Sequence, residues 1–168
     1  MLSTLRNLLI QVLFFFTVFQ GISMLRETSM LSTDTLITSS SDLSFKQVKT
    51  LTGEPISLSA QGKTTVLYFF APWCQICHAS IGNLQALYEK NDHIDVIAVA
   101  MDYSSVSEIE AFTQQHQLTF PIALGNEKIK QAFSISAYPS YYIISEENSI
   151  IGKSMGYSSE LGLYLRSL

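Results

Sequence analysis

Residues 66–78 read Val-Leu-Tyr-Phe-Phe-Ala-Pro-Trp-Cys-Gln-Ile-Cys-His, and they contain the only two cysteines of the 168-residue chain. The β-branched and aromatic run over residues 64–70 is typical of a central strand that is buried on both faces. Cys74 and Cys77 follow with two residues between them, a spacing that closes a disulfide when the first turn of a helix holds both. Cys74 would then lie among unpaired backbone N–H groups, which favour the thiolate that attacks in disulfide exchange. The stretch predicts a strand-to-helix junction that carries a reactive dithiol.

The chain on either side of this junction alternates between strand-like and helical patterns. Residues 45–49 and 56–58 alternate around the turn residues 51–55, which predicts a hairpin. We expect helices from the cysteines to about Asn91, from a capping box at residues 107–110, over residues 127–133, and after a cap at residues 158–160. Further strands are expected over residues 96–101, 141–144 and 149–152. This order predicts an α/β fold with a central mixed β-sheet flanked by helices.

The N-terminal region is apolar. Residues 7–25 carry no charged side chain, and a run of roughly 18 apolar-leaning residues reaches the lower limit for a membrane span. A cleavable signal peptide would need small residues after the apolar core, yet the first alanine is Ala60 and the nearest substitute lies at residues 21–23. We therefore predict an uncleaved signal-anchor transmembrane helix over residues 1–25, with a cleaved signal peptide and a buried core helix as the alternatives.

The segment that follows, residues 26–43, is rich in serine and threonine, has no aromatic residue, and predicts a flexible tether. Residues 44–168 then form the folded domain. The formal net charge is −4 and no basic run occurs, which argues against nucleic acid as a partner. The charges that flank the apolar run hardly favour one orientation, so export of the domain is inferred from its chemistry.

Three stretches of this domain resemble the thioredoxin-like superfamily: residues 69–77, 120–122 and 133–144. The resemblance runs from about Phe45 to Leu168 and implies a thioredoxin-like fold. It implies that Cys74 and Cys77 are catalytic and form a redox-active disulfide. It also implies that Pro139 follows a cis peptide bond and faces that disulfide. Trp73, Tyr138 and Pro139 would bind the partner protein. The anchor and the leading hairpin are similar to the membrane-tethered TlpA/DsbE-like group, and the likeness is greatest to its suppressor-of-copper-sensitivity D type.

This resemblance implies a periplasmic thiol–disulfide oxidoreductase, held in the inner membrane by a single pass over residues 7–25. It would reduce disulfides in partner proteins and be recharged by a membrane electron carrier of the DsbD/CcdA kind. The same residues could also serve an oxidant that donates its disulfide. We assign no cofactor beyond the Cys74–Cys77 pair, and no metal.

The sequence departs from the family pattern at three places. Tyr68 occupies the position, six residues before the first cysteine, where many relatives carry a buried acid that is thought to help deprotonate the second thiol. Gly82 stands where thioredoxin has a helix-kinking proline, and it also permits a bend. Gln75 and Ile76 lie between the cysteines in place of Gly-Pro or Pro-Pro.

Other functions were weighed for the same cysteines. A purely structural bridge over so short a loop would remove little unfolded-state entropy. Cys74-x-x-Cys77-His78 also fits c-type haem attachment, with Met101 or Met155 as a second iron ligand, and two thiolates suit Cu(I). His78 has two possible roles. It is either a solvated helix residue or, because it lies four residues from Cys74 on one helical face, a group that stabilises the Cys74 thiolate when protonated. We assign no function to His93 and His116.

Overall fold

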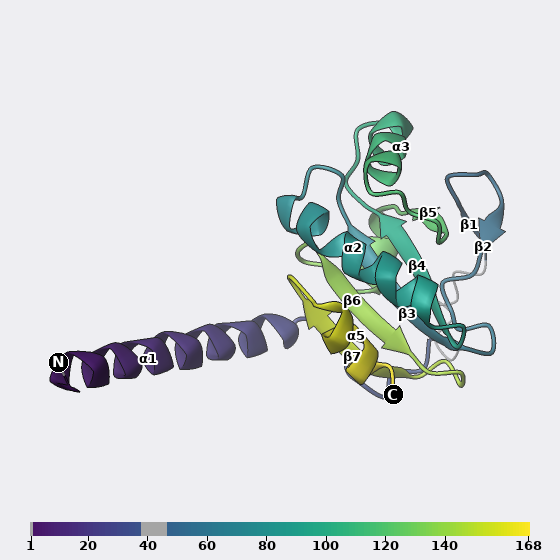
Figure 1. The fold of residues 1–168 in the computed structure, drawn as a ribbon. Helices are drawn as coiled ribbons and strands as arrows, with labels where there is room; N and C mark the ends of the chain where they lie inside the picture. The colour runs from purple at the N-terminus through teal and green to yellow at the C-terminus, as the bar shows by residue number, and fades with distance from the viewer. Residues whose placement is uncertain (1, 38–46) are drawn as a thin grey trace.

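The computed structural model describes residues 2–37 and 47–168, and Figure 1 shows its fold. Its helices are α1 (Leu2–Glu27), α2 (Gln75–Lys90), α3 (Val106–Gln115), α4 (Glu127–Ala132) and α5 (Glu160–Arg166). Its strands are β1 (Val48–Lys49), β2 (Pro55–Ile56), β3 (Thr64–Phe70), β4 (Ile94–Ala100), β5 (Ile122–Leu124), β6 (Ser140–Ile144) and β7 (Ile150–Met155).

Five strands form one mixed sheet in the order β5-β4-β3-β6-β7. β3 lies at its centre, parallel to β4 and antiparallel to β6, while β5 is parallel to β4 and β7 is antiparallel to β6. Every residue of β3 from Thr65 to Phe70 is buried, as its apolar composition predicts. The prediction of a central mixed sheet is confirmed, and the junction that carries the cysteines leaves from the middle strand.

The two faces of β3 contribute to two hydrophobic clusters. Val66, Tyr68 and Phe70 pack with the buried residues of α2, α3 and α5 on one face. Leu67 and Phe69 pack on the other face with α4 and with apolar residues of segments 30–37 and 48–60. The alternation follows from the two-residue period of a strand. α2 lies over the first face because its buried apolar positions recur at helical spacing: Cys77, Ile81, Leu84 and Leu87.

The N-terminal helix α1 covers most of the predicted anchor and extends away from the domain (Figure 1). Its described apolar side chains between residues 8 and 18 are exposed on all sides. Across residues 2–37 and 47–168, no helix combines the length and apolarity needed to cross a membrane.

The first part of the predicted tether packs on the domain. Met30 and Ile37 are buried, and the backbone N–H of Asp34 donates to the carbonyl of Ile150 in β7 at 2.8 Å. The backbone N–H of Leu31 donates to the Tyr142 hydroxyl at 2.9 Å. Residues 30–37 therefore pack against the domain, which the prediction of a tether did not anticipate. The reason is that two apolar side chains among the serines and threonines are buried beside β7. Residues 38–43 lie outside the described residues.

Two local predictions need correction. The hairpin is present as β1 and β2, but each strand has only two residues, and the expected positions 45 and 46 lie outside the described residues. The capping box expected from Ser107 to Glu110 is wrong. Ser105 is the N-cap of α3, and the Glu108 carboxylate accepts a hydrogen bond from the backbone N–H of Ser104 at 3.0 Å.

Candidate functional site: the Cys74–Cys77 disulfide and its surroundings

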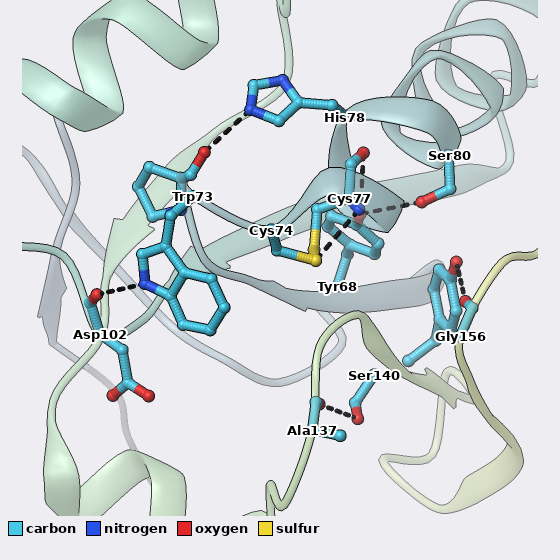
Figure 2. The surroundings of a disulfide bond; sticks show 12 residues. Tyr68, Trp73, Cys74, Cys77, His78, Ser80, Asp102, Ala137, Ser140 and Gly156 are labelled. Atoms are coloured by element: carbon cyan, nitrogen blue, oxygen red, sulfur yellow. Dashed lines mark hydrogen bonds between the residues drawn. A yellow bond between two sulfur atoms is a disulfide. The ribbon is translucent and has the colours of Figure 1, made fainter.

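Cys74 and Cys77 form a disulfide at the N-terminus of α2 (Figure 2), with their Cα atoms 5.2 Å apart. The chain leaves β3 at Phe70, turns through Ala71 and Pro72, and reaches Cys74, whose extended backbone makes it the N-cap of α2. Its Sγ accepts a hydrogen bond from the backbone N–H of Cys77 at 3.1 Å. The first sulfur is thus held where a helix N-terminus stabilises negative charge.

The two cysteines differ in access. Cys74 retains 6% of its accessible surface, whereas Cys77 is fully buried under the first turn of the helix. A partner protein approaching from solvent therefore meets Cys74 first. Cys74 is the more exposed of the two cysteines, as expected, and its role as the attacking thiol stays a prediction.

Trp73 is the most exposed aromatic side chain around the disulfide, with 60% of its surface accessible. Its indole Nε1–H donates to the backbone carbonyl of Asp102 at 2.9 Å, and its ring meets the Tyr138 ring edge-to-face with the centroids 6.0 Å apart. Because the only polar atom of the indole is bonded, the part of Trp73 that solvent meets is its apolar ring. The structure also brings Trp73 and Tyr138, two of the residues expected to bind the partner protein, into contact.

Asp102 fixes both of these aromatic rings. Its carboxylate accepts from the Tyr138 hydroxyl at 3.0 Å and from Lys130 Nζ at 2.6 Å, while its carbonyl holds Trp73. The Lys130 ammonium lowers the pKa of Asp102. Burial, and then the Asp102 carboxylate, raise the pKa of Tyr138 above its usual range. One residue at the end of β4 thereby links the active-site turn, α4 and the segment before β6.

Pro139 follows a cis peptide bond from Tyr138, as the family resemblance implies. Its carbonyl accepts from the backbone N–H of Gly156 at 2.8 Å, which ties this segment to the end of β7. Figure 2 draws its neighbours Ala137 and Ser140 among the surroundings of the disulfide, with the Ser140 hydroxyl donating to the Ala137 carbonyl at 2.8 Å.

Tyr68 lies beneath the helix that carries the cysteines. Its hydroxyl is 3.1 Å from Ser80 Oγ and donates weakly to the Cys77 carbonyl at 3.5 Å. Burial raises the pKa of Tyr68 far above its usual range. The hydroxyl therefore stays protonated at any working pH and cannot act as the base that an acidic residue would provide at this position.

His78 points away from the disulfide in Figure 2. Its Nε2 lies 2.9 Å from the Pro72 carbonyl, and its Nδ1 lies 2.7 Å from Nε2 of His116. Because a carbonyl only accepts, Nε2 of His78 must carry a proton. Burial, followed by the charge on His78, lowers the pKa of His116. The predicted thiolate-tuning residue is thus bonded to a second histidine, to which the sequence analysis assigned no role.

The residues of the haem alternative are not brought together. Met101 and Met155 belong to the cluster on the opposite face of the sheet from Cys74 and Cys77, and both ring nitrogens of His78 have protein partners. Within residues 2–37 and 47–168, no group of three or more His, Cys, Asp or Glu side chains has the arrangement of a metal site.

Sequence reasoning missed Asp102, Lys130 and Ser80. Asp102 could have been found from the sequence, because it lies just beyond a predicted strand. Polar residues just beyond the carboxyl ends of parallel strands gather at the edge of an α/β sheet where ligands bind. Lys130 and Ser80 had none, since each acts through a neighbour that only the fold supplies.

Known proteins match this arrangement of strand, dithiol and following elements. The family model described as AhpC/TSA family matches residues 42–153, which is more than half of the chain. The chain belongs to the AhpC/TSA family. The chain is also similar to the thioredoxin-like protein YneN of Bacillus subtilis, with 36% identity over 107 residues, which covers 61% of this chain and 63% of YneN.

A second relative, sporulation thiol-disulfide oxidoreductase A of Bacillus subtilis, is 28% identical over 108 residues, covering 61% of this chain and 66% of its own length. The chain thus spans slightly less than two thirds of each of these relatives. The crystal structure of StoA from Bacillus subtilis superposes with a TM-score of 0.65 at 24% identity, covering 73% of this chain and 95% of StoA. That likeness shows the thioredoxin-like fold.

Proposed function

We propose that this protein is a thiol–disulfide oxidoreductase in which Cys74 attacks and Cys77 resolves. The observation that carries the proposal is the placement of Cys74 Sγ at the helix N-cap, 3.1 Å from the Cys77 N–H, in the cysteine that keeps 6% of its surface accessible while Cys77 keeps none. In the reduced protein the same N–H can donate to a thiolate, and a charge-assisted bond is stronger than a neutral one. The similar protein sporulation thiol-disulfide oxidoreductase A is named for the same activity, which supports the proposal.

The reaction proceeds in two exchanges. The Cys74 thiolate attacks one sulfur of a partner disulfide, forms a mixed disulfide, and releases the other partner sulfur as a thiolate. Cys77, after losing its proton, attacks Cys74 Sγ and releases the second partner sulfur. The partner gains two electrons and the Cys74–Cys77 disulfide forms. A membrane dithiol carrier of the DsbD/CcdA kind would return two electrons and complete the cycle.

The partner protein would bind against Trp73, Tyr138 and Pro139. Trp73 and Tyr138 offer a fixed aromatic surface beside Cys74, because Asp102 holds both rings. The Tyr138–Pro139 segment would line the partner's extended backbone, as the family resemblance implies. Cysteine-containing partner proteins are the substrate class that these features support.

Net reduction is the direction we favour, with disulfide donation by the same residues as the alternative. The reduction potential against glutathione separates them. A reduction potential close to that of thioredoxin, about −270 mV, supports a reductase. A potential close to that of DsbA, about −120 mV, contradicts it.

The location is part of the proposal. Residues 7–25 would anchor the chain in the inner membrane in a single pass, with the domain in the periplasm, as in the TlpA/DsbE-like and suppressor-of-copper-sensitivity D type proteins. The uncharged apolar run of residues 7–25 and the exposed apolar side chains between residues 8 and 18 support this idea. A C-terminal alkaline phosphatase fusion should be active and remain with membranes after carbonate washing. A soluble or inactive fusion would rule out this location.

The test of the activity is capture of the intermediate. Reduced Cys77→Ala protein should form a stable mixed disulfide with insulin, whose chains are joined by disulfides, seen as a mass increase that dithiothreitol reverses. Cys74→Ala protein, in which the more accessible thiol is gone, should capture at least about tenfold less. Equal capture by both variants would refute the assigned roles.

A further inference from the structure

A hollow of about 430 Å³ lies beside the disulfide, between the active-site turn and α3. Its wall includes Pro72, Trp73, His78, Glu108 and Phe112. Trp73, which directly precedes Cys74, forms part of this wall, so the hollow opens next to the cysteine that is proposed to attack. Neither of the two exchange steps described above makes use of it.

The ring nitrogens of Trp73 and His78 in this wall already have partners. Trp73 Nε1–H donates to the Asp102 carbonyl, and both ring nitrogens of His78 are engaged with Pro72 and His116. These two side chains can therefore present only ring faces and edges to a ligand, while Phe112, with 2% of its surface accessible, packs against the His78 ring. The aromatic part of the wall favours groups that stack.

Glu108 supplies the negative charge of the wall. It stands in the first turn of α3, is exposed, and uses Oε2 to accept the Ser104 N–H at 3.0 Å. Its Oε1 is contacted by no donor among the residues that the structure describes. Lys130 is linked to Trp73 only by way of Asp102, and its ammonium group is paired with the Asp102 carboxylate at 2.6 Å. The hollow therefore has an available carboxylate oxygen with no competing protein cation on it.

Ring faces beside a carboxylate are what a guanidinium or ammonium group binds, through cation–π attraction and a charge-assisted hydrogen bond. We infer that this hollow receives a basic side chain, arginine or lysine, placed near the reacting cysteine of the partner protein. The inference rests on the proposed oxidoreductase function and adds the class of partner sequence that it prefers.

The test uses the full-length reduced protein and three disulfide-linked peptides that differ only at one residue beside the cysteine: arginine, glutamine or glutamate. A second set places the variable residue on the other side of the cysteine. In one of the two sets, kcat/KM should be about five-fold higher for arginine than for glutamine and lowest for glutamate, mainly through KM. The preference should nearly vanish in 1 M salt, where the Debye length is about 3 Å.

Two variants decide whether Glu108 is responsible. Glu108→Gln keeps an oxygen to accept the Ser104 N–H but removes the charge, and it should reduce the arginine preference to less than about two-fold. Glu110→Gln removes an exposed charge from the same helix outside the hollow and should leave the preference as it is in the unaltered protein.

The outcomes separate this inference from the function on which it rests. If all peptides are reduced at equal rates, the basic-residue preference is refuted and the oxidoreductase function stands. The same holds if Glu108→Gln keeps the full preference. If none of the peptides is reduced, the proposed function itself fails.

Discussion

Removing the Tyr68 hydroxyl should destabilise the fold without stopping the chemistry. Tyr68 is fully buried, and its hydroxyl lies 3.1 Å from Ser80 Oγ, which is also fully buried. Tyr68→Phe removes one neutral hydrogen bond and leaves the serine hydroxyl without this partner. The net loss of the bond plus the desolvation of a stranded hydroxyl predicts a decrease of about 1–3 kcal/mol in the free energy of unfolding.

A double-mutant cycle measures how much of that loss belongs to the pair. Ser80→Ala should cost a similar amount, since it strands the Tyr68 hydroxyl with only the distant Cys77 carbonyl at 3.5 Å. With both hydroxyls removed no polar group is stranded, so the double variant should be more stable than the sum of the single losses predicts, by about 1 kcal/mol or more. Urea unfolding followed by circular dichroism measures each value. Additive losses would show that the two hydroxyls do not interact.

The activity of Tyr68→Phe tests whether the Tyr68 hydroxyl takes part in proton transfer from Cys77. Burial holds the pKa of Tyr68 so high that it cannot accept the proton of Cys77. Tyr68→Phe should therefore reduce insulin within about two-fold of the unaltered rate at a temperature where both proteins are folded. A loss of tenfold or more, equivalent to about 1.4 kcal/mol of barrier, would mean that the hydroxyl takes part in proton transfer.

Three further substitutions have directions fixed by the structure. Gly82→Ala should stabilise the protein by about 0.5–1 kcal/mol, because an added Cβ meets nothing within 4 Å in the middle of α2. A loss of stability on urea unfolding would show that α2 needs the flexibility of glycine. Gly125→Ala should instead cost about 1–3 kcal/mol, since its Cβ would lie 2.6 Å from the Ala100 carbonyl oxygen; an unchanged urea midpoint would contradict this. The lowered pKa of His116 means that the unfolded chain binds a proton first, so stability should fall as the pH drops through about 6.5. His116→Asn should flatten that fall between pH 7 and pH 5, and an equal slope in both proteins would refute the assignment.

The active-site junction was predictable because its information is local. A β-branched and aromatic run, a proline, and two cysteines at helical spacing specify a strand, a turn and a helix start without reference to the rest of the chain. The same holds for the cap at Ser159, whose hydroxyl accepts the Gly162 N–H as its position before Glu160 predicts. The order of the strands is not local in this sense, since β6 pairs with β3 across 70 residues of chain.

The electrostatic surroundings of the site were not predictable from the sequence, because they depend on residues that are far apart along the chain. Helical spacing places His78 on the face of Cys74, yet the ring turns to the Pro72 carbonyl and His116, because partly buried ring nitrogens take hydrogen-bond partners where they exist. His116 comes from the end of α3, 38 residues later, and only the packing of α3 beside α2 brings it there. Asp102 likewise acts through Lys130 and Tyr138, which arrive from α4 and from the segment before β6.

These placements constrain how Cys77 can lose its proton. An acid at position 68 would have been the natural acceptor, but the chain has Tyr68, which stays protonated, and His78 points its Nε2–H at the Pro72 carbonyl. Within the proposed mechanism, the first exchange produces a partner thiolate, and that thiolate is a base of suitable strength for another thiol. A partner with an internal disulfide keeps this thiolate on the same chain, close to Cys77, whereas a linear mixed disulfide loses it to solvent. Resolution should therefore depend on buffer concentration for linear peptide disulfides and be independent of it for cyclic ones. Equal buffer dependence in a stopped-flow measurement of the second step would show that the proton leaves by another route.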